Sequence, residues 1–150
     1  MAASLTTNGV LSAEQPSFMC KPSGAQSSPA TGATVVFNTE IYDQGSDFAS
    51  NTFTAPVTGR YQFNCVLRVD ASDLDNSYTY FHQVTSNRNY EFGLTGVSAW
   101  DADADYRQIT WGGLCDLDAS DTAYIRYNFS GGATIGSLSV NCFYSGFLVC

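Results

Sequence analysis

RYQFNCVLRV, residues 60–69, alternates between apolar and polar side chains. In an extended chain, successive side chains point to opposite faces, so the apolar set would share one face of a strand. That set is Tyr61, Phe63, Cys65, Leu67 and Val69, and the opposite face carries Arg60, Gln62, Asn64 and Arg68. The segment therefore predicts a β-strand with one buried face.

Two further segments repeat this period of two, and no helical periodicity is present. Residues 123–129 place Ala123, Ile125, Tyr127 and Phe129 on one face, and residues 108–117 place Ile109, Trp111, Cys115 and Leu117 together. Turn-forming sequences separate such segments, namely KPSG, SSPATG, DQGS, APVTG, DASD and SGG. Short strands at this spacing predict an all-β antiparallel sandwich or jelly roll.

Length and composition are those of one globular domain. The 150 residues are 44% hydrophobic, which is enough for a sizeable core. We expect residues 16–150 to form the domain and residues 1–15 to form an extended N-terminal arm. The first residues lack the basic start and apolar run of a secretory signal, and no stretch is long enough to span a bilayer. We therefore expect neither secretion nor membrane insertion.

The charge balance is acidic. Fourteen Asp and Glu residues stand against six Lys and Arg, for a net charge of -8. Phosphate backbones are bound by clustered cations, so nucleic acid is not an expected partner.

Five cysteines are widely spaced, with no CxxC pair of the kind that binds zinc. Cys65, Cys115, Cys142 and Cys150 lie in apolar or alternating segments. We interpret them as buried thiols rather than as a disulfide framework.

Two strand-like segments are apolar on both faces, FYSGFLVC (residues 143–150) and YTYFHQV (residues 78–84). In a lone two-layer sandwich each strand should keep one solvated face. A second copy of the chain would cover the extra apolar face, so this pattern predicts a homo-oligomer.

The order of several motifs resembles the complement C1q and tumour-necrosis-factor-like domain family. Phe53, Thr54, Ala55, Pro56, Gly59, Tyr61 and Phe63 match the family's strand-linking segment, and Phe143, Ser145, Gly146, Phe147 and Leu148 match its closing strand. The family's Leu-x-x-Gly-Asp turn corresponds to residues 117–121, with Ser120 in the glycine position. The resemblance covers about residues 16–150 and implies a ten-stranded jelly roll that assembles as a homotrimer. Gly59 suits a turn with positive φ, and Gly146 suits a site of close backbone approach.

The resemblance also indicates in which kind of protein this domain occurs. There is no collagen-like stalk, and residues 3–18 are similar to the segment that precedes such domains in bacteriophage virion proteins. We therefore expect a virion protein made in the host cytoplasm, with capsid or tail proteins as partners. The expected role is capsid decoration or a fibre knob, and the alternatives are a tail-tip adhesin for host glycans or a secreted recognition module.

Catalytic motifs are absent from the sequence. His82 is the only histidine, and it lies among aromatic residues, where a packing role is typical. No GxSxG, HExxH or SxxK motif occurs, so we expect no enzyme and no catalytic residue. The glycine-rich segment 130–137 lacks the end of a phosphate loop and is interpreted as a hairpin turn.

SAWDADADYRQITW, residues 98–111, contains aspartates at every second position, Asp101, Asp103 and Asp105. An EF-hand loop starting at Asp101 would need glycine at its sixth position and glutamate at its twelfth, where Tyr106 and Gly112 stand. Several members of the resembled family bind calcium near the threefold axis through acidic loops. The three aspartates are therefore candidate Ca²⁺ ligands in a trimer, and the alternative is an ordinary exposed acidic loop.

Trp100 and Tyr106 flank these aspartates in a predicted loop. Aromatic rings beside carboxylates can bind sugars, so these two residues are candidate glycan ligands. The alternative for Trp100 is an inward position in the core.

Overall fold

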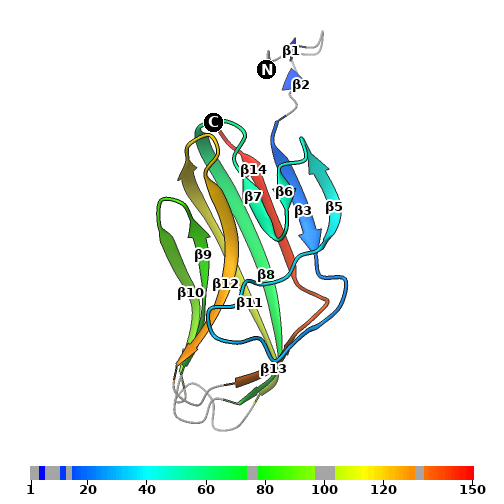
Figure 1. Ribbon diagram of the computed structural model, residues 1–150, viewed down its shortest axis with the longest axis vertical. Coiled ribbons are helices and arrows are strands. Elements are labelled where there is room, and N and C mark those ends of the chain that lie inside the picture. The colour runs from blue at the N-terminus through cyan, green and yellow to red at the C-terminus, as the bar shows by residue number, and fades with distance from the viewer. Residues whose placement is uncertain (1–3, 6–10, 13–14, 74–77, 97–103, 131–133) are drawn as a thin grey trace.

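The computed structural model describes residues 4–5, 11–12, 15–73, 78–96, 104–130 and 134–150. Two β-sheets pack face to face in an elongated sandwich (Figure 1). No helix occurs among the described residues, and so none that could cross a membrane. The prediction of an all-β jelly-roll fold is confirmed.

The larger sheet has seven strands. One edge of β8 (Gly59–Asp73) pairs with β14 (Phe143–Leu148), which is followed outward by β3 (Ser17–Lys21) and β5 (Thr39–Gln44), and, further along, with β13 (Thr134–Leu138), which is followed by β4 (Gln26–Ser27). The other edge of β8 pairs with β11 (Ala104–Leu117).

The smaller sheet has five strands in the order β10 (Asn89–Gly96), β9 (Tyr78–Thr85), β12 (Thr122–Ser130), β7 (Thr52–Thr54) and β6 (Phe48–Ala49). A separate pair joins β1 (Ser4–Leu5) to β2 (Leu11–Ser12). The described residues thus contain fourteen strand segments, of which four, β1, β2, β4 and β6, are only two residues long, so that ten longer strands remain. That residues 1–15 act as an arm stays a prediction.

Strand β8 is the centre of the larger sheet. It pairs with β11 along one side and with β14 and β13 along the other. Its predicted apolar face is buried, since Tyr61, Phe63, Cys65, Leu67 and Val69 are at most 2% exposed. The alternation in the sequence therefore identified both the strand and its inner face.

Aromatic rings fill the space between the sheets. Phe18 stacks on Phe48 and Phe53 with ring centroids 4.8 and 5.1 Å apart, and Phe63 stacks on Tyr144 at 5.8 Å. These five side chains are all at most 4% exposed. They come from strands far apart in the sequence, so their packing holds the two sheets together.

At both Gly146 and Gly59, the β-carbon of any larger residue would clash with neighbouring atoms. A β-carbon at Gly146 would lie 2.7 Å from Phe63 Cδ1, which confirms the predicted close approach. The prediction that Gly59 needs a positive φ is wrong, because its φ is not in the left-handed region. A β-carbon there would instead lie 2.6 Å from Leu148 Cδ1 and 2.7 Å from the Cys150 carbonyl oxygen.

The hairpin interpretation of residues 130–137 is also wrong. Strand β12 before the segment belongs to the smaller sheet, whereas β13 after it pairs with β4 and β8 in the larger sheet. The segment therefore connects the two layers, and a period of two cannot distinguish such a crossover from a hairpin.

Four of the five cysteines are buried, and all five are free thiols. Burial raises the pKa of Cys115 to about 11 and also raises the pKa values of Cys20, Cys65 and Cys142. The prediction of a buried Cys150 is wrong, since this residue is exposed after the last strand. An apolar segment ending at a sheet edge need not bury its final residue.

Ser120 occupies a left-handed backbone conformation, with φ of 77°. Its N–H donates to the Ala55 carbonyl at 2.7 Å, and the Ala55 N–H donates to the Asp121 carbonyl at 2.8 Å. These bonds fix the turn between β11 and β12 against the segment that follows β7. The position where the resembled family has glycine therefore requires a conformation that glycine adopts without strain.

We expect the substitution Ser120→Gly to raise the free energy of unfolding by roughly 0.5–1 kcal/mol, because relief of left-handed strain exceeds the entropy that glycine adds to the unfolded chain. Urea unfolding of the two proteins measures the difference. Ser120→Ala is the matched control, since alanine keeps the strain and should bring no gain. Equal stabilisation by alanine would contradict a backbone origin.

Candidate binding surfaces

The outer face of the larger sheet carries a central zone without charged side chains. Cross-strand register places its members in three rows: Leu114, Gln62 and Phe147; then Gly112, Asn64, Ser145 and Met19; then Thr110, Val66 and Phe143. We call this set the neutral face. Its sequence signals were present in the outward positions of residues 60–69 and in the doubly apolar segment 143–150.

The neutral face combines exposed apolar groups with the absence of charge. Leu114 is 55% exposed and Phe147 is 44% exposed. Charged side chains flank it, with Arg60 opposite Asp116 at one end, Arg68 bonded to Asp70 at the other, and Lys21 following Met19 on the same face of β3. In a chain of net charge -8, such a zone is where two copies can approach with least repulsion.

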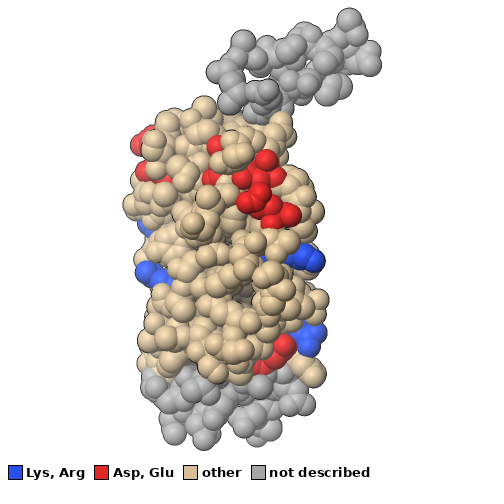
Figure 2. Space-filling model, turned by 45° about the vertical axis from the view of Figure 1, so that its right-hand side comes forward, with Lys and Arg blue, Asp and Glu red and all other residues tan. Residues whose placement is uncertain are grey.

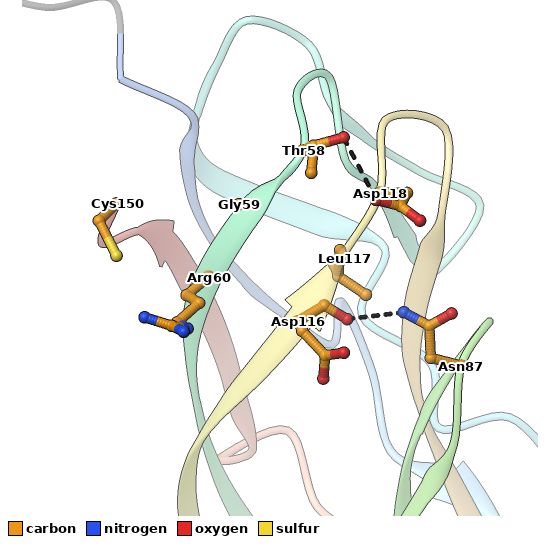
Figure 3. Close-up of a pocket in the computed structure, with 8 residues that line it drawn as sticks. All are labelled: Thr58, Gly59, Arg60, Asn87, Asp116, Leu117, Asp118 and Cys150. Carbon is orange, nitrogen blue, oxygen red and sulfur yellow. Dashed lines mark hydrogen bonds between the residues drawn. The ribbon is translucent and has the colours of Figure 1, made fainter.

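A polar cavity of about 320 Å³ opens where β8 begins and β11 ends (Figure 3). Its lining consists of Thr58, Gly59, Arg60, Asn87, Asp116, Leu117, Asp118 and Cys150. Two contacts order its wall: Asn87 Nδ2 donates to the Asp116 carbonyl at 2.8 Å, and Thr58 Oγ1 donates to Asp118 Oδ1 at 3.4 Å.

The chemistry of this cavity is limited. Asp116 Oδ2 already accepts a hydrogen bond from Arg88 Nη2 at 2.8 Å, and both side chains are more than half exposed. Cys150 is the one thiol in the lining, and no histidine stands beside it as a base. The cavity can admit a small polar molecule, but its residues do not form a nucleophile and base pair.

The outer face of the smaller sheet carries a hydrogen-bonded cluster around His82. Arg126 Nη2 and Asn128 Nδ2 each lie 3.2 Å from His82 Nδ1. The His82 ring packs edge-on against Tyr80 with centroids 5.2 Å apart. The predicted packing role of His82 is therefore accompanied by polar contacts to β12.

This geometry fixes the protonation of the imidazole. A guanidinium can only donate, so Nδ1 must be the acceptor and the proton of the neutral ring sits on Nε2. Burial and the Arg126 charge lower the pKa of His82, and the Glu91 carboxylate opposes them. The net lowering favours the neutral form of His82.

We expect the stability of the protein to fall as the pH drops below the ordinary histidine pKa of 6.5. The folded pKa lies below that value, so in this range the unfolded chain binds more protons, whereas above it both states are neutral and stability is complete. Urea midpoints measured between about pH 7.5 and about pH 5.5 would record the loss. Because the chain has one histidine, His82→Gln should flatten this dependence. An unchanged slope in the variant would assign the effect to other groups.

The residues predicted to bind calcium or glycan are only partly covered by the structure. Trp100, Asp101 and Asp103 lie outside the described residues. Asp105 and Tyr106 belong to β11, so the prediction that they lie in a loop is wrong. Long β8 provides pairing partners that extend β11 back to Ala104.

Tyr106 is 67% exposed, and the Arg68 guanidinium lies 4.5 Å from its ring centroid. One cation therefore already contacts this ring. Among the described residues, no group of three or more His, Cys, Asp or Glu side chains is arranged to hold a metal ion. The calcium role of the three aspartates and the glycan role of Trp100 and Tyr106 stay predictions.

Two buried polar side chains that link the sheets were missed from the sequence. Arg107, 6% exposed, reaches from β11 to donate from Nη2 to Thr79 Oγ1 at 3.0 Å. Gln83 in β9 donates to the Tyr144 hydroxyl in β14 at 3.0 Å. A signal for Arg107 existed, because it shares its strand face with Ile109 and Trp111. Both links fix how the two layers sit on each other.

Comparison with known proteins identifies a matching family and solved structures with a similar fold. The family model for the C1q domain matches residues 17–149. The globular domain of zebrafish complement 1qA protein is similar to this chain with a TM-score of 0.66 and 17% identity, over 91% of this chain and 98% of that one. Murine APRIL at pH 8.5 is similar with a TM-score of 0.60 and 12% identity, over 90% and 99% of the two chains. No curated protein matches the sequence. At these identities, the structural likenesses concern the fold alone.

Proposed function

Because this chain belongs to the C1q domain family, we propose that it is a non-enzymatic module that assembles as a homotrimer and serves as a structural protein of a bacteriophage virion. Domains of this family are generally binding modules without catalytic activity. The role would be to decorate the capsid or to form a fibre knob, with capsid or tail proteins as neighbours.

The observation that carries the trimer is the neutral face. It exposes Leu114 and Phe147 on one row, separated by the uncharged Gln62. An exposed apolar zone on a soluble chain is typical of an interaction surface. In the view of Figure 2, acidic side chains gather mainly on the upper part of the coloured surface, and wide areas among the charged groups carry no charge. A self-interface on the neutral face would avoid bringing the acidic groups of several copies together.

The virion setting is favoured by the cysteines and by residues 3–18. All five cysteines are free, as is usual for a protein made in a reducing cytosol and unusual for a secreted recognition module. Residues 3–18 are similar to the lead of virion proteins that carry such domains.

Two measurements test the proposal. Light scattering of the purified chain at micromolar concentration should give three times the monomer mass, and a monomer would overturn the trimer. Labelled antibodies against the chain should decorate purified phage particles in electron micrographs, with particles lacking the gene as the control. Absence of the protein from intact particles would overturn the virion role and leave the trimer standing.

A further inference from the structure

We propose that the outer face of the smaller sheet binds an uncharged carbohydrate, through Tyr78, Tyr80, His82, Glu91 and Leu94. The site lies on the sheet opposite the neutral face and is complete within one chain. It is therefore independent of the proposed trimer and distinct from Trp100 and Tyr106.

Alternate residues of β9 provide an aromatic stripe. Tyr78 and Tyr80 have ring centroids 5.7 Å apart, and the stripe continues to His82 at 5.2 Å from Tyr80. Tyr78 is 44% exposed. A tyrosine ring offers a flat apolar surface with a polar tip, which suits a sugar ring that has C–H groups on its faces and hydroxyls around its edge.

A cavity adjoins this stripe. Tyr78, Glu91, Leu94 and Gly96 line a volume of about 390 Å³, within the usual range for small-molecule sites. Leu94 is 60% exposed. A β-carbon added at Gly96 would meet no atom of the described residues within 4 Å. The space lies beside an aromatic wall, an aliphatic wall and a carboxylate.

Glu91 and His82 provide hydrogen-bonding groups that do not satisfy each other. His82 Nε2 and Glu91 Oε2 lie 3.8 Å apart, which is too long for a direct hydrogen bond. The Nε2 proton can therefore be donated to a ligand oxygen, while the carboxylate can accept from two hydroxyls. A donor beside a bidentate acceptor matches adjacent hydroxyl groups on a sugar ring.

The charges favour an uncharged ligand. Among the described residues that line the cavity, Glu91 is the one that carries a charge, and the Arg126 guanidinium is directed to His82 Nδ1. The chain as a whole carries a net charge of -8. Sialylated or sulfated sugars would meet repulsion here, whereas neutral hexoses would not.

Binding of the full chain to immobilised neutral oligosaccharides built from glucose, galactose or mannose tests the proposal, with sialylated and sulfated counterparts beside them. At least one neutral sugar should bind, and the anionic sugars should bind more weakly. Tyr78→Ala and Glu91→Gln should each weaken binding at least about tenfold, since each removes a principal contact. Tyr42→Ala is the matched control, because it removes a tyrosine of similar exposure, 49% against 44%, from β5 in the other sheet and should leave binding unchanged.

Three outcomes would overturn the site. The first is no binding to any neutral sugar at millimolar concentration, and the second is stronger binding of the anionic sugars. The third is loss of binding in Tyr42→Ala with retention in Tyr78→Ala. Circular dichroism of each variant checks that it is folded, and light scattering of the same samples reports the oligomeric state. A trimer that binds no sugar overturns only this site, and a monomer that binds sugar overturns only the trimer.

Discussion

Replacing Gly146 with alanine should lower the free energy of unfolding by about 3 kcal/mol, at the upper end of the usual cost of overpacking a core. The added β-carbon would lie 2.7 Å from Phe63 Cδ1 and 2.8 Å from Phe18 Cε1. Real contacts of this kind do not occur, so at least one ring must move.

Neither ring has room to move. Phe63 stacks on Tyr144, and Phe18 stacks on Phe53 at 5.1 Å. All four side chains are at most 1% exposed, so displacing one ring displaces the next. The strain therefore spreads through the aromatic core that joins the two sheets.

Gly24→Ala is the control for this substitution. Gly24 is exposed, its φ is not in the left-handed region, and a β-carbon there would meet nothing within 4 Å. We expect it to change stability by no more than about 0.5 kcal/mol. Urea unfolding of the three proteins gives the comparison. A similar, small effect at both glycines would show that the core beside Gly146 can relax.

Replacing Leu114 and Phe147 together with aspartate should convert the proposed trimer into a folded monomer. Both side chains are about half exposed in the single chain, so the change should cost the protomer little stability. In an assembled interface on the neutral face, each copy would contribute two desolvated carboxylates without partners. Every 1.4 kcal/mol of lost interface energy is about a tenfold change in the dissociation constant, so several such charges should abolish assembly at micromolar concentration.

Light scattering measures the mass, and circular dichroism confirms that the variant is folded. Leu94→Asp is the matched control, because Leu94 is 60% exposed but belongs to β10 in the smaller sheet. It should remain a trimer. A double variant that stays trimeric, or a Leu94 variant that dissociates, would place the interface elsewhere.

Local patterns in the sequence predicted much of the architecture. Alternation in residues 60–69 identified β8 and its buried face, and the crowded surroundings of Gly146 were expected from its aromatic neighbours. The predictions that failed concern contacts made by residues distant in the chain. Gly59 is restricted by Leu148 and the Cys150 carbonyl rather than by its own turn, and β11 reaches Asp105 and Tyr106 because β8 continues beside it.

For the candidate sites, too, local patterns were visible in the sequence, whereas contacts between residues distant in the chain were not. His82 and the acidic segment 101–105 stood out in the sequence, yet the partners of His82 come from β10 and β12, at Glu91, Arg126 and Asn128. Arg126 and Asn128 lie 44 and 46 positions from His82, and no spacing rule in the sequence joins residues so far apart. The sequence therefore marked residues 78–84 as unusual through their two apolar faces, but it did not show which residues of the other strands lie beside them.

By itself, the sequence determined the fold class, the central strand and which of its side chains face inward, because the two faces of a strand follow directly from a period of two. Only the tertiary structure decided which outward residues become neighbours. Leu114, Gln62 and Phe147 come from three separate strands and meet in one row through the register of β8 with β11 and β14. Register depends on packing across the whole sandwich, so a surface built from several strands exists only once the sheets have assembled.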